Sequence, residues 1–305
     1  MAYDASDPRA AMASLSTGPT ILPERFARAE SFEFGDLSPD LDPLGSKTWY
    51  CRGQNFIVAY SLAEAGAELT RKAQPDEYAI VLPERGLEAD VVARGTTMHV
   101  PGYSVAFVPP GESTVRVGSS GGIIRLFSAQ STDLAAKCVN AGSYAEPHPS
   151  VAEMGEWPEP PDGQRVRVYS FDVPPEPGRL GRIWRSTTIM LAYSYPWDGP
   201  RDVTKLAPHS HPDFEQGSLA IGGEFVHHLR WPWIPNMNEW LPDQHIRCGS
   251  PSFTVIPPHV IHTSQAVGSG ANLLIDVFCP GRSDWSRMPG WVLNASDYPG
   301  LGDPS

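Results

Sequence analysis

Three histidines in the second half of the chain have the type and spacing of metal ligands. His209 and His211 lie two residues apart in HSHPDFEQ, and His262 follows a proline-rich turn in VIPPHVIH. Side chains at positions i and i+2 of a strand project from the same face, so both imidazoles of the pair could reach one ion. Imidazoles with one oxygen ligand suit Fe, Mn, Ni, Cu, Co or Zn. The pattern predicts a transition-metal site, with His262 as the remote partner.

Polar residues near this motif are candidates for proton transfer. Glu215 and Gln216 follow the histidine pair, and as neighbours on one strand they cannot both point inward. In EFVHHLRW, only one of His227 and His228 can face the interior of the fold. We predict His228, Glu215 and Tyr193 as candidate catalytic residues.

The elements that position these residues belong to an internal repeat. Four pairs of segments match in the same order along the chain: IVAYS (57–61) with MLAYS (190–194), QPDEYAIVL (74–82) with HPDFEQGSLAI (211–221), FVPPG (107–111) with VIPPH (255–259), and GGIIRLFS (121–128) with ANLLIDVF (271–278). Conserved order indicates a duplication. Short apolar runs between turns predict an all-β fold with one short helix at 132–139.

Composition shifts divide the chain into five parts. The predicted parts are an N-terminal arm (1–45), a first barrel-like unit (46–140), a linker rich in Pro, Glu and Gly (141–164), a second unit (165–282) and a C-terminal tail (283–305). In the repeat, Thr114 falls where the second unit has His262, which predicts a first unit without metal ligands. Asp276 falls opposite Arg125 and is interpreted as a salt-bridge residue.

The histidine motifs resemble those of the cupin superfamily, whose first motif is H-x-H followed by an acid and a glycine. The resemblance implies two double-stranded β-helix (jelly-roll) barrels, as in a bicupin. It implies one divalent transition metal ion (Fe, Mn, Ni or Zn) on His209, His211, His262 and an oxygen ligand. That ligand is Gln216 or Glu215, and both remain open. The second motif departs from the family at His259, where cupins usually have glycine. Many bicupins also dimerise, so the resemblance allows a homodimer and leaves the oligomeric state open.

Charge and hydropathy restrict the partners. The formal charge of -12 disfavours binding to nucleic acid. No apolar run approaches the roughly 18 residues of a membrane span, and the first residues lack the basic start of a signal peptide. A soluble, cytoplasmic protein with a small-molecule substrate is expected.

The resemblance leaves three functions open. The first is a metal-dependent enzyme that isomerises, hydrates or eliminates a small anionic substrate such as a sugar acid. The second is an Fe(II)-dependent dioxygenase that cleaves an aromatic or diketone substrate. The third is a non-catalytic sugar-binding or storage-type bicupin with a structural metal.

Overall fold

The computed structural model describes residues 7–11, 22–155 and 157–300, and its regular structure is almost entirely strand. The strands of the first half are β2 (Asp40–Leu41), β3 (Lys47–Arg52), β4 (Phe56–Ala63), β5 (Glu68–Gln74), β6 (Tyr78–Leu82), β7 (Glu88–Ala93), β8 (Thr96–Pro101), β9 (Ser104–Val108), β10 (Gly111–Val117) and β11 (Gly121–Ser128). Those of the second half are β13 (Arg182–Arg185), β14 (Met190–Tyr193), β15 (Trp197–Asp198), β16 (Gln216–Gly222), β17 (Phe225–Arg230), β18 (Gln244–Cys248), β19 (Ser252–Ile256), β20 (Ile261–Ala266) and β21 (Ala271–Phe278). Two further strands, β1 (Glu30–Glu33) and β12 (Arg167–Ser170), flank the first half.

Helical turns are short and lie between the strands. They are α1 (Thr132–Ala135), α2 (Ser283–Ser286) and the 3-10 turns Pro8–Ala11, Phe34–Asp36, Ala141–Tyr144 and Met237–Glu239. The helix predicted at 132–139 is therefore present over its first four residues. Among the described residues, no helix combines the length and the apolar character needed to cross a membrane.

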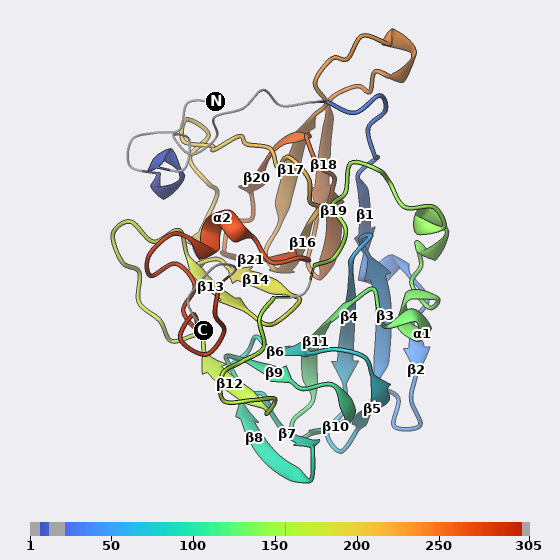
Figure 1. The fold of residues 1–305 in the computed structure, drawn as a ribbon, viewed down its shortest axis with the longest axis vertical. Helices are drawn as coiled ribbons and strands as arrows, with labels where there is room; N and C mark the ends of the chain where they lie inside the picture. Colours follow the sequence, from blue (N-terminus) through green and yellow to red (C-terminus); the bar gives the residue numbers. More distant parts are fainter. Residues whose placement is uncertain (1–6, 12–21, 156, 301–305) are drawn as a thin grey trace.

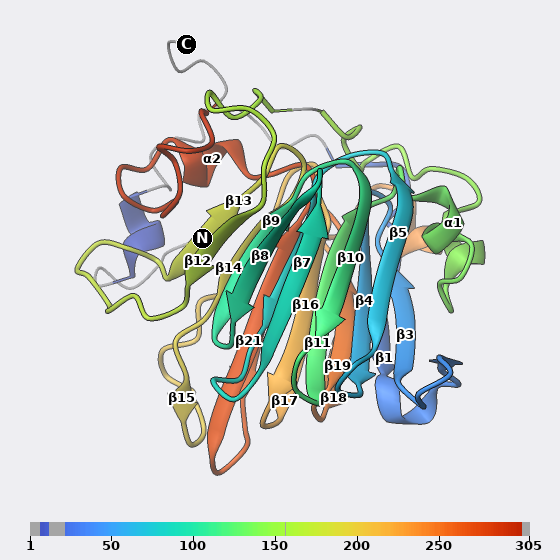
Figure 2. The same ribbon diagram turned by 90° about the horizontal axis from the view of Figure 1, so that it is seen from below.

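The strands form two barrels, each made of a large and a small sheet (Figure 1). In the first barrel, the sheet β5-β10-β7-β8 covers the sheet β12-β9-β6-β11-β4-β3-β2, and Figure 2 shows the smaller sheet in front. In the second, β18-β17-β20 accompanies β1-β19-β16-β21-β14-β13, with β15 paired to β21. The predicted two-barrel, all-β fold is confirmed.

The two large sheets bury their strands on both faces. In β11, Ile124 and Leu126 belong to the core between the barrels, whereas Ile123 and Phe127 line the interior of the first barrel. Because both faces are buried, such strands are continuously apolar instead of alternating. Each of these two equivalent strands carries one charged residue, Arg125 in β11 and Asp276 in β21.

Each barrel includes an edge strand that stands, in the sequence, directly before the other barrel. The strand β1 precedes the first barrel in sequence, yet it pairs antiparallel with β19 of the second (Figure 1). The strand β12 follows the predicted linker, yet it pairs with β9 of the first. The sheet pairing thus differs from the unit boundary predicted at residues 164 and 165.

A buried carboxylate of the first barrel joins the two barrels. Glu77, immediately before β6, accepts hydrogen bonds from the backbone nitrogen and the hydroxyl of Thr187, at 3.1 and 2.9 Å. The Tyr298 hydroxyl donates to its other oxygen at 2.9 Å. Burial raises the pKa of Glu77, and these three donors oppose the shift. Glu77 therefore ties the first barrel to the β13–β14 turn and to the C-terminal tail.

Candidate metal centre

A single antiparallel bridge brings the two histidine motifs together. The backbone nitrogen of His209 donates to the carbonyl of His262 at 3.0 Å, and the reverse bond measures 2.7 Å. His262 belongs to β20, whereas His209 and His211 lie in the segment before β16. The candidate ligand atoms of the three side chains all lie within 4.8 Å of one another. The structure therefore assembles the three histidines singled out from the sequence.

The turn before β20 contains the departure from the cupin motif. His259 has a φ of 64°, in the left-handed region that costs a residue with a side chain about 1–2 kcal/mol. This conformation directs its backbone nitrogen to the carbonyl of His211, at 2.6 Å. A histidine therefore occupies a backbone position that suits glycine, and it still links the second motif to the first.

Backbone carbonyls determine which ring nitrogen faces the centre of the cluster. Nδ1 of His209 donates to the carbonyl of Ala207 at 3.0 Å, and Nδ1 of His262 donates to that of Val260 at 2.9 Å. A carbonyl can only accept, so Nδ1 carries the proton and Nε2 keeps its lone pair. The third ring, that of His211, is 2% exposed, and neither of its nitrogens has a partner among the described residues.

Burial keeps the three imidazoles neutral. It lowers the pKa of His209 and His211 well below the ordinary value and that of His262 to about 4. Neutral imidazoles with available lone pairs are what a transition metal ion binds, and ligands that need no deprotonation bind it readily at neutral pH. The donor set thus fits the metal ion that the sequence motifs imply.

Gln216 presents an oxygen to the histidines. Its Oε1 lies 3.4 Å from Nε2 of His262. Its amide nitrogen donates to Oδ1 of Asp276 at 3.0 Å and to the Ser218 hydroxyl at 2.9 Å. The Ser218 hydroxyl donates in turn to the same Oδ1 at 2.7 Å. Since a carboxylate accepts and cannot donate, this network orients the amide oxygen toward the histidines.

Glu215 points the other way, into the interface between the barrels. Its carboxylate accepts from the backbone nitrogen of Gln54 at 2.5 Å and from the Tyr144 hydroxyl at 3.3 Å. Burial raises its pKa to about 7. Its role mirrors that of Glu77, because each glutamate binds a strand turn of the opposite barrel and a tyrosine hydroxyl. Of the two oxygen ligands left open by the sequence, the geometry favours Gln216.

The other candidate catalytic residues separate into two groups. Tyr193 lines the pocket beside the histidines, whereas His228 and Glu215 are not among the residues of its wall. The ring of His228 instead contacts His245, with their Nδ1 atoms 2.7 Å apart, and Gln265 at 2.9 Å. Its neighbour His227 is the one that faces inward, at 1% exposure.

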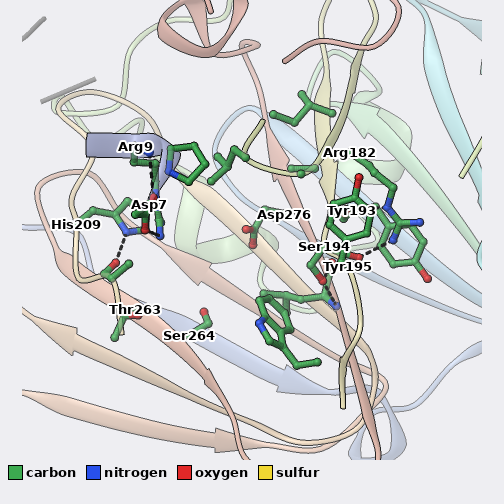
Figure 3. Close-up of a pocket in the computed structure, with 18 of the residues that line it drawn as sticks. Asp7, Arg9, Arg182, Tyr193, Ser194, Tyr195, His209, Thr263, Ser264 and Asp276 are labelled. Carbon is green, nitrogen blue, oxygen red and sulfur yellow. Dashed lines mark hydrogen bonds and ion pairs between the residues drawn. The ribbon is translucent and has the colours of Figure 1, made fainter. Parts of the chain in front are cut away.

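The pocket beside the histidines has a volume of about 440 Å³ and a mostly cationic charged lining (Figure 3). His209, Gln216 and His262 contribute to its wall. The charged side chains that line it are Asp7, Arg9, Arg182, Arg201, Lys205 and Asp276. Figure 3 shows Arg9 and Asp7 beside His209, Arg182 with the tyrosines on the opposite side, and Asp276 between them. This lining favours an anionic ligand.

Two of these cations are held by neutral acceptors. Arg182 donates to the carbonyls of Phe171 and Ser194 at 2.8 and 2.6 Å, and Arg201 donates to that of Ser264 at 3.1 Å. Carbonyl acceptors orient a guanidinium without cancelling its charge. By contrast, Arg9 forms an ion pair of 2.6 Å with Asp7.

Asp276 is the site residue whose role the sequence analysis misjudged. The repeat suggested a salt bridge, but within the described residues no cation lies within 4.0 Å of its carboxylate. Burial raises its pKa to about 6. The sequence signal for a functional role was the single acid in the apolar segment NLLIDVF. A buried acid needs hydrogen bonds or charges that compensate for its loss of contact with water.

Within the described residues, the three histidines are also the one group of His, Cys, Asp or Glu side chains with metal-ligand geometry. No such group occurs among the described residues of the first barrel. All four cysteines are buried and unpaired.

Comparisons with known proteins identify the fold. No family model matches the sequence, and no curated protein matches it. Among solved structures, an oxalate decarboxylase studied for its substrate binding mode aligns at 14% identity with a TM-score of 0.54, over 85% of this chain and 81% of that chain. The formate complex of Lactobacillus farciminis oxalate decarboxylase aligns at 13% identity and 0.53, over 90% and 94%. At these identities the likeness concerns the fold alone: the chain shares the two-barrel fold of these oxalate decarboxylases, which agrees with the bicupin architecture that the histidine motifs imply.

Proposed function

We propose that the chain is a metal-dependent enzyme that acts on a small anionic organic substrate by isomerisation, hydration or elimination. The observation that carries the proposal is the convergence of three neutral histidines, two of which line the wall of a cationic pocket. In this proposal His209, His211, His262 and Gln216 hold one divalent transition metal ion, such as Fe, Mn, Ni or Zn. When bound, such an ion supplies Lewis-acid polarisation of a substrate oxygen.

The charge of the site supports an anionic substrate. All four proposed ligands are neutral, so they leave the positive charge of a divalent ion uncompensated. Arg182 and Arg201 add positive charges, and the hydrogen bonds that they donate go to neutral carbonyl and hydroxyl oxygens. A carboxylate placed between these groups gains charge-assisted hydrogen bonds.

Two pocket residues are suited to handle protons. In Asp276, Oδ1 accepts the bonds from Gln216 and Ser218, so we assign Oδ2 as the atom that takes a proton from the substrate. The hydroxyl of Tyr193 is buried without a partner in the described structure. Burial raises its pKa to about 12, so it stays protonated and can donate a hydrogen bond.

The two solved structures compared above suggest the first reaction to test. They are oxalate decarboxylases, one of them in complex with formate. Their chemistry supports carbon–carbon bond cleavage in a small carboxylate as a lyase reaction for this site. Sugar acids form the second group of substrates to test, because they combine a carboxylate with neighbouring hydroxyls.

Elemental analysis of the purified protein tests the metal, and a substrate panel then tests the activity. We expect about one transition metal ion per chain, lost in His209→Ala and His262→Ala and retained in the control His228→Ala. Turnover of a small carboxylate or sugar acid would support the proposal. Iron with substrate-dependent O2 uptake would replace it with the dioxygenase, and bound metal without turnover would favour the non-catalytic alternative. No metal after incubation with divalent ions would refute it.

A further inference from the structure

The first barrel has an arginine at the position where the second has Asp276. In β11, Arg125 pairs with Ala59 of β4 and with Ile80 of β6. In β21, Asp276 pairs in the same manner with Ala192 of β14 and with Ser218 of β16. The duplication therefore places opposite charges at equivalent positions in the two barrels.

The side chain of Arg125 lies in an apolar interior. Alternation along β11 puts it on the same face as Ile123 and Phe127, which both belong to the core of the first barrel. The residue is 4% exposed, and its guanidinium lies 5.8 Å from the centre of the Phe127 ring. The strand thus carries a positive charge into a hydrophobic environment.

Within the described part of the chain, no protein group neutralises this charge. No carboxylate or carbonyl accepts a hydrogen bond from Arg125, and its Nε is buried without an acceptor. A second guanidinium beside the same ring, that of Arg71, is compensated by two bonds of 2.6 and 2.9 Å to Asp133 and one of 2.8 Å to Gln74. Burying an uncompensated charge is costly, so Arg125 requires a partner from outside the chain.

A pair of buried hydroxyl groups belongs to the same barrel interior. The Tyr78 ring stacks on Phe127 at 4.8 Å, and its hydroxyl lies 3.0 Å from that of Ser113. Burial raises the pKa of Tyr78, while the charges of Arg125 and Arg71 act to lower it, which places the phenol within their electrostatic reach. Tyr78 also occupies the position that corresponds to Gln216, since each begins the strand paired to the repeat's last strand.

We propose that Arg125 forms the centre of an anion-binding site inside the first barrel, which takes one small monoanion of the carboxylate or oxyanion type. One uncompensated positive charge calls for a single negative charge. A guanidinium offers parallel donors that match two oxygens of a carboxylate. Formate, acetate and bicarbonate are the smallest ligands of this class to test. This site is independent of the metal centre and of the function proposed for it.

Anomalous scattering from bromide locates the site without any mutation. Crystals of the wild-type protein, grown without other small anions and soaked in bromide, are expected to show an anomalous peak within hydrogen-bond distance of the Arg125 guanidinium, and formate is expected to remove it by competition. A map without a peak at Arg125 would show that solvent alone compensates the charge, and would overturn the proposal. A peak that formate fails to displace would exclude the carboxylate class.

Thermal unfolding of metal-free protein provides the second test, with formate added to a gluconate buffer. Arg125→Met keeps the length of the side chain and removes its charge, and Arg116→Met is the control, because Arg116 is an exposed residue that pairs with Glu68. We expect formate to raise the melting temperature of the wild type and the control equally, and to raise that of Arg125→Met by less than about half as much. Without formate, Arg125→Met should melt higher than the wild type. An equal response of all three proteins would contradict the proposal.

Discussion

Asp276 holds Gln216 so that the amide oxygen, and not the amide nitrogen, faces the three histidines. The nitrogen donates to Oδ1 of Asp276 at 3.0 Å, which leaves Oε1 at 3.4 Å from Nε2 of His262. The amide of a glutamine can rotate to present either its oxygen or its nitrogen. The carboxylate of Asp276 behind it therefore determines whether the histidines face an oxygen ligand or a hydrogen-bond donor.

This relationship predicts different outcomes for two substitutions of Asp276. Asp276→Asn keeps an oxygen that accepts from Gln216, so metal affinity should stay within a few fold, while loss of the proton acceptor should lower turnover about 10²–10⁴-fold. Asp276→Ala removes the acceptor and should weaken metal binding about 10–100-fold. Metal titration and steady-state kinetics on both variants would measure this. Equal metal affinity in the two variants would show that Gln216 keeps its orientation without Asp276.

Arg201 should contribute to anion binding in the pocket. Its guanidinium lines the pocket and donates hydrogen bonds to the carbonyls of Ser264 and Lys205. Because a hydrogen bond to a charged group contributes about 1.5–3 kcal/mol, Arg201→Met should weaken oxalate binding to the metal-loaded protein by at least about tenfold. Isothermal titration measures the affinity, and Arg116→Met, in the first barrel, is the matched control. An unchanged dissociation constant for Arg201→Met would remove Arg201 from the binding site.

The left-handed backbone at His259 predicts an unusual order of stability. Glycine should be more stable than alanine at this position by about 0.5–1 kcal/mol, because relief of steric strain exceeds the entropy that glycine loses on folding. Urea unfolding of His259→Gly and His259→Ala compares the two directly, since both lack the ring. If the alanine variant is the more stable, the turn does not adopt the φ of 64°.

Glu77 lies where the two barrels meet, and it should make the free energy of unfolding depend on pH. Its folded pKa is raised by burial above the ordinary value of 4.5. Its contribution to stability is therefore complete below that value and is lost as the pH rises through the folded pKa. Glu77→Gln retains an oxygen for Thr187 and does not titrate. The free energy of unfolding of Glu77→Gln relative to wild type should thus increase from about pH 4.5 upward and then level off.

Chemical unfolding at a series of pH values measures this difference. Arg167 and the Tyr298 hydroxyl also act on Glu77, and both are present in the wild type and the variant, so subtraction isolates the carboxyl. A difference that does not change with pH would show that Glu77 titrates at its ordinary value in the folded protein.

The sequence predicted local features well, because these depend on spacing. Strand periodicity identified two β units, and the H-x-H pair with a remote histidine identified the residues that the backbone bridge between His209 and His262 brings together. The adjacent pair Glu215 and Gln216 could not be resolved, because a shift of one residue in register exchanges the two faces of a strand. Only the pairing of β16 with β19 and β21 determines which of them faces the histidines.

Long-range relationships were harder to predict. The apolar pattern of β12 is compatible with either barrel, and the repeat does not reveal which sheet edge remains open to receive it. Arg125 and Asp276 looked like partners in an alignment, although the structure places them inside different barrels. A duplication preserves position within each copy, and it says nothing about contact between the copies.

The exchange of β1 and β12 has a consequence for the order in which the chain folds during synthesis. The large sheet of the first barrel stays incomplete until Ser170, the last residue of β12, has emerged from the ribosome. The second barrel, in turn, requires an edge strand that precedes the first barrel in the chain, since Glu30–Glu33 must remain available until β19 has been synthesised. Translation therefore cannot deliver one finished barrel followed by another, and the two acquire their final edges as a single cooperative unit.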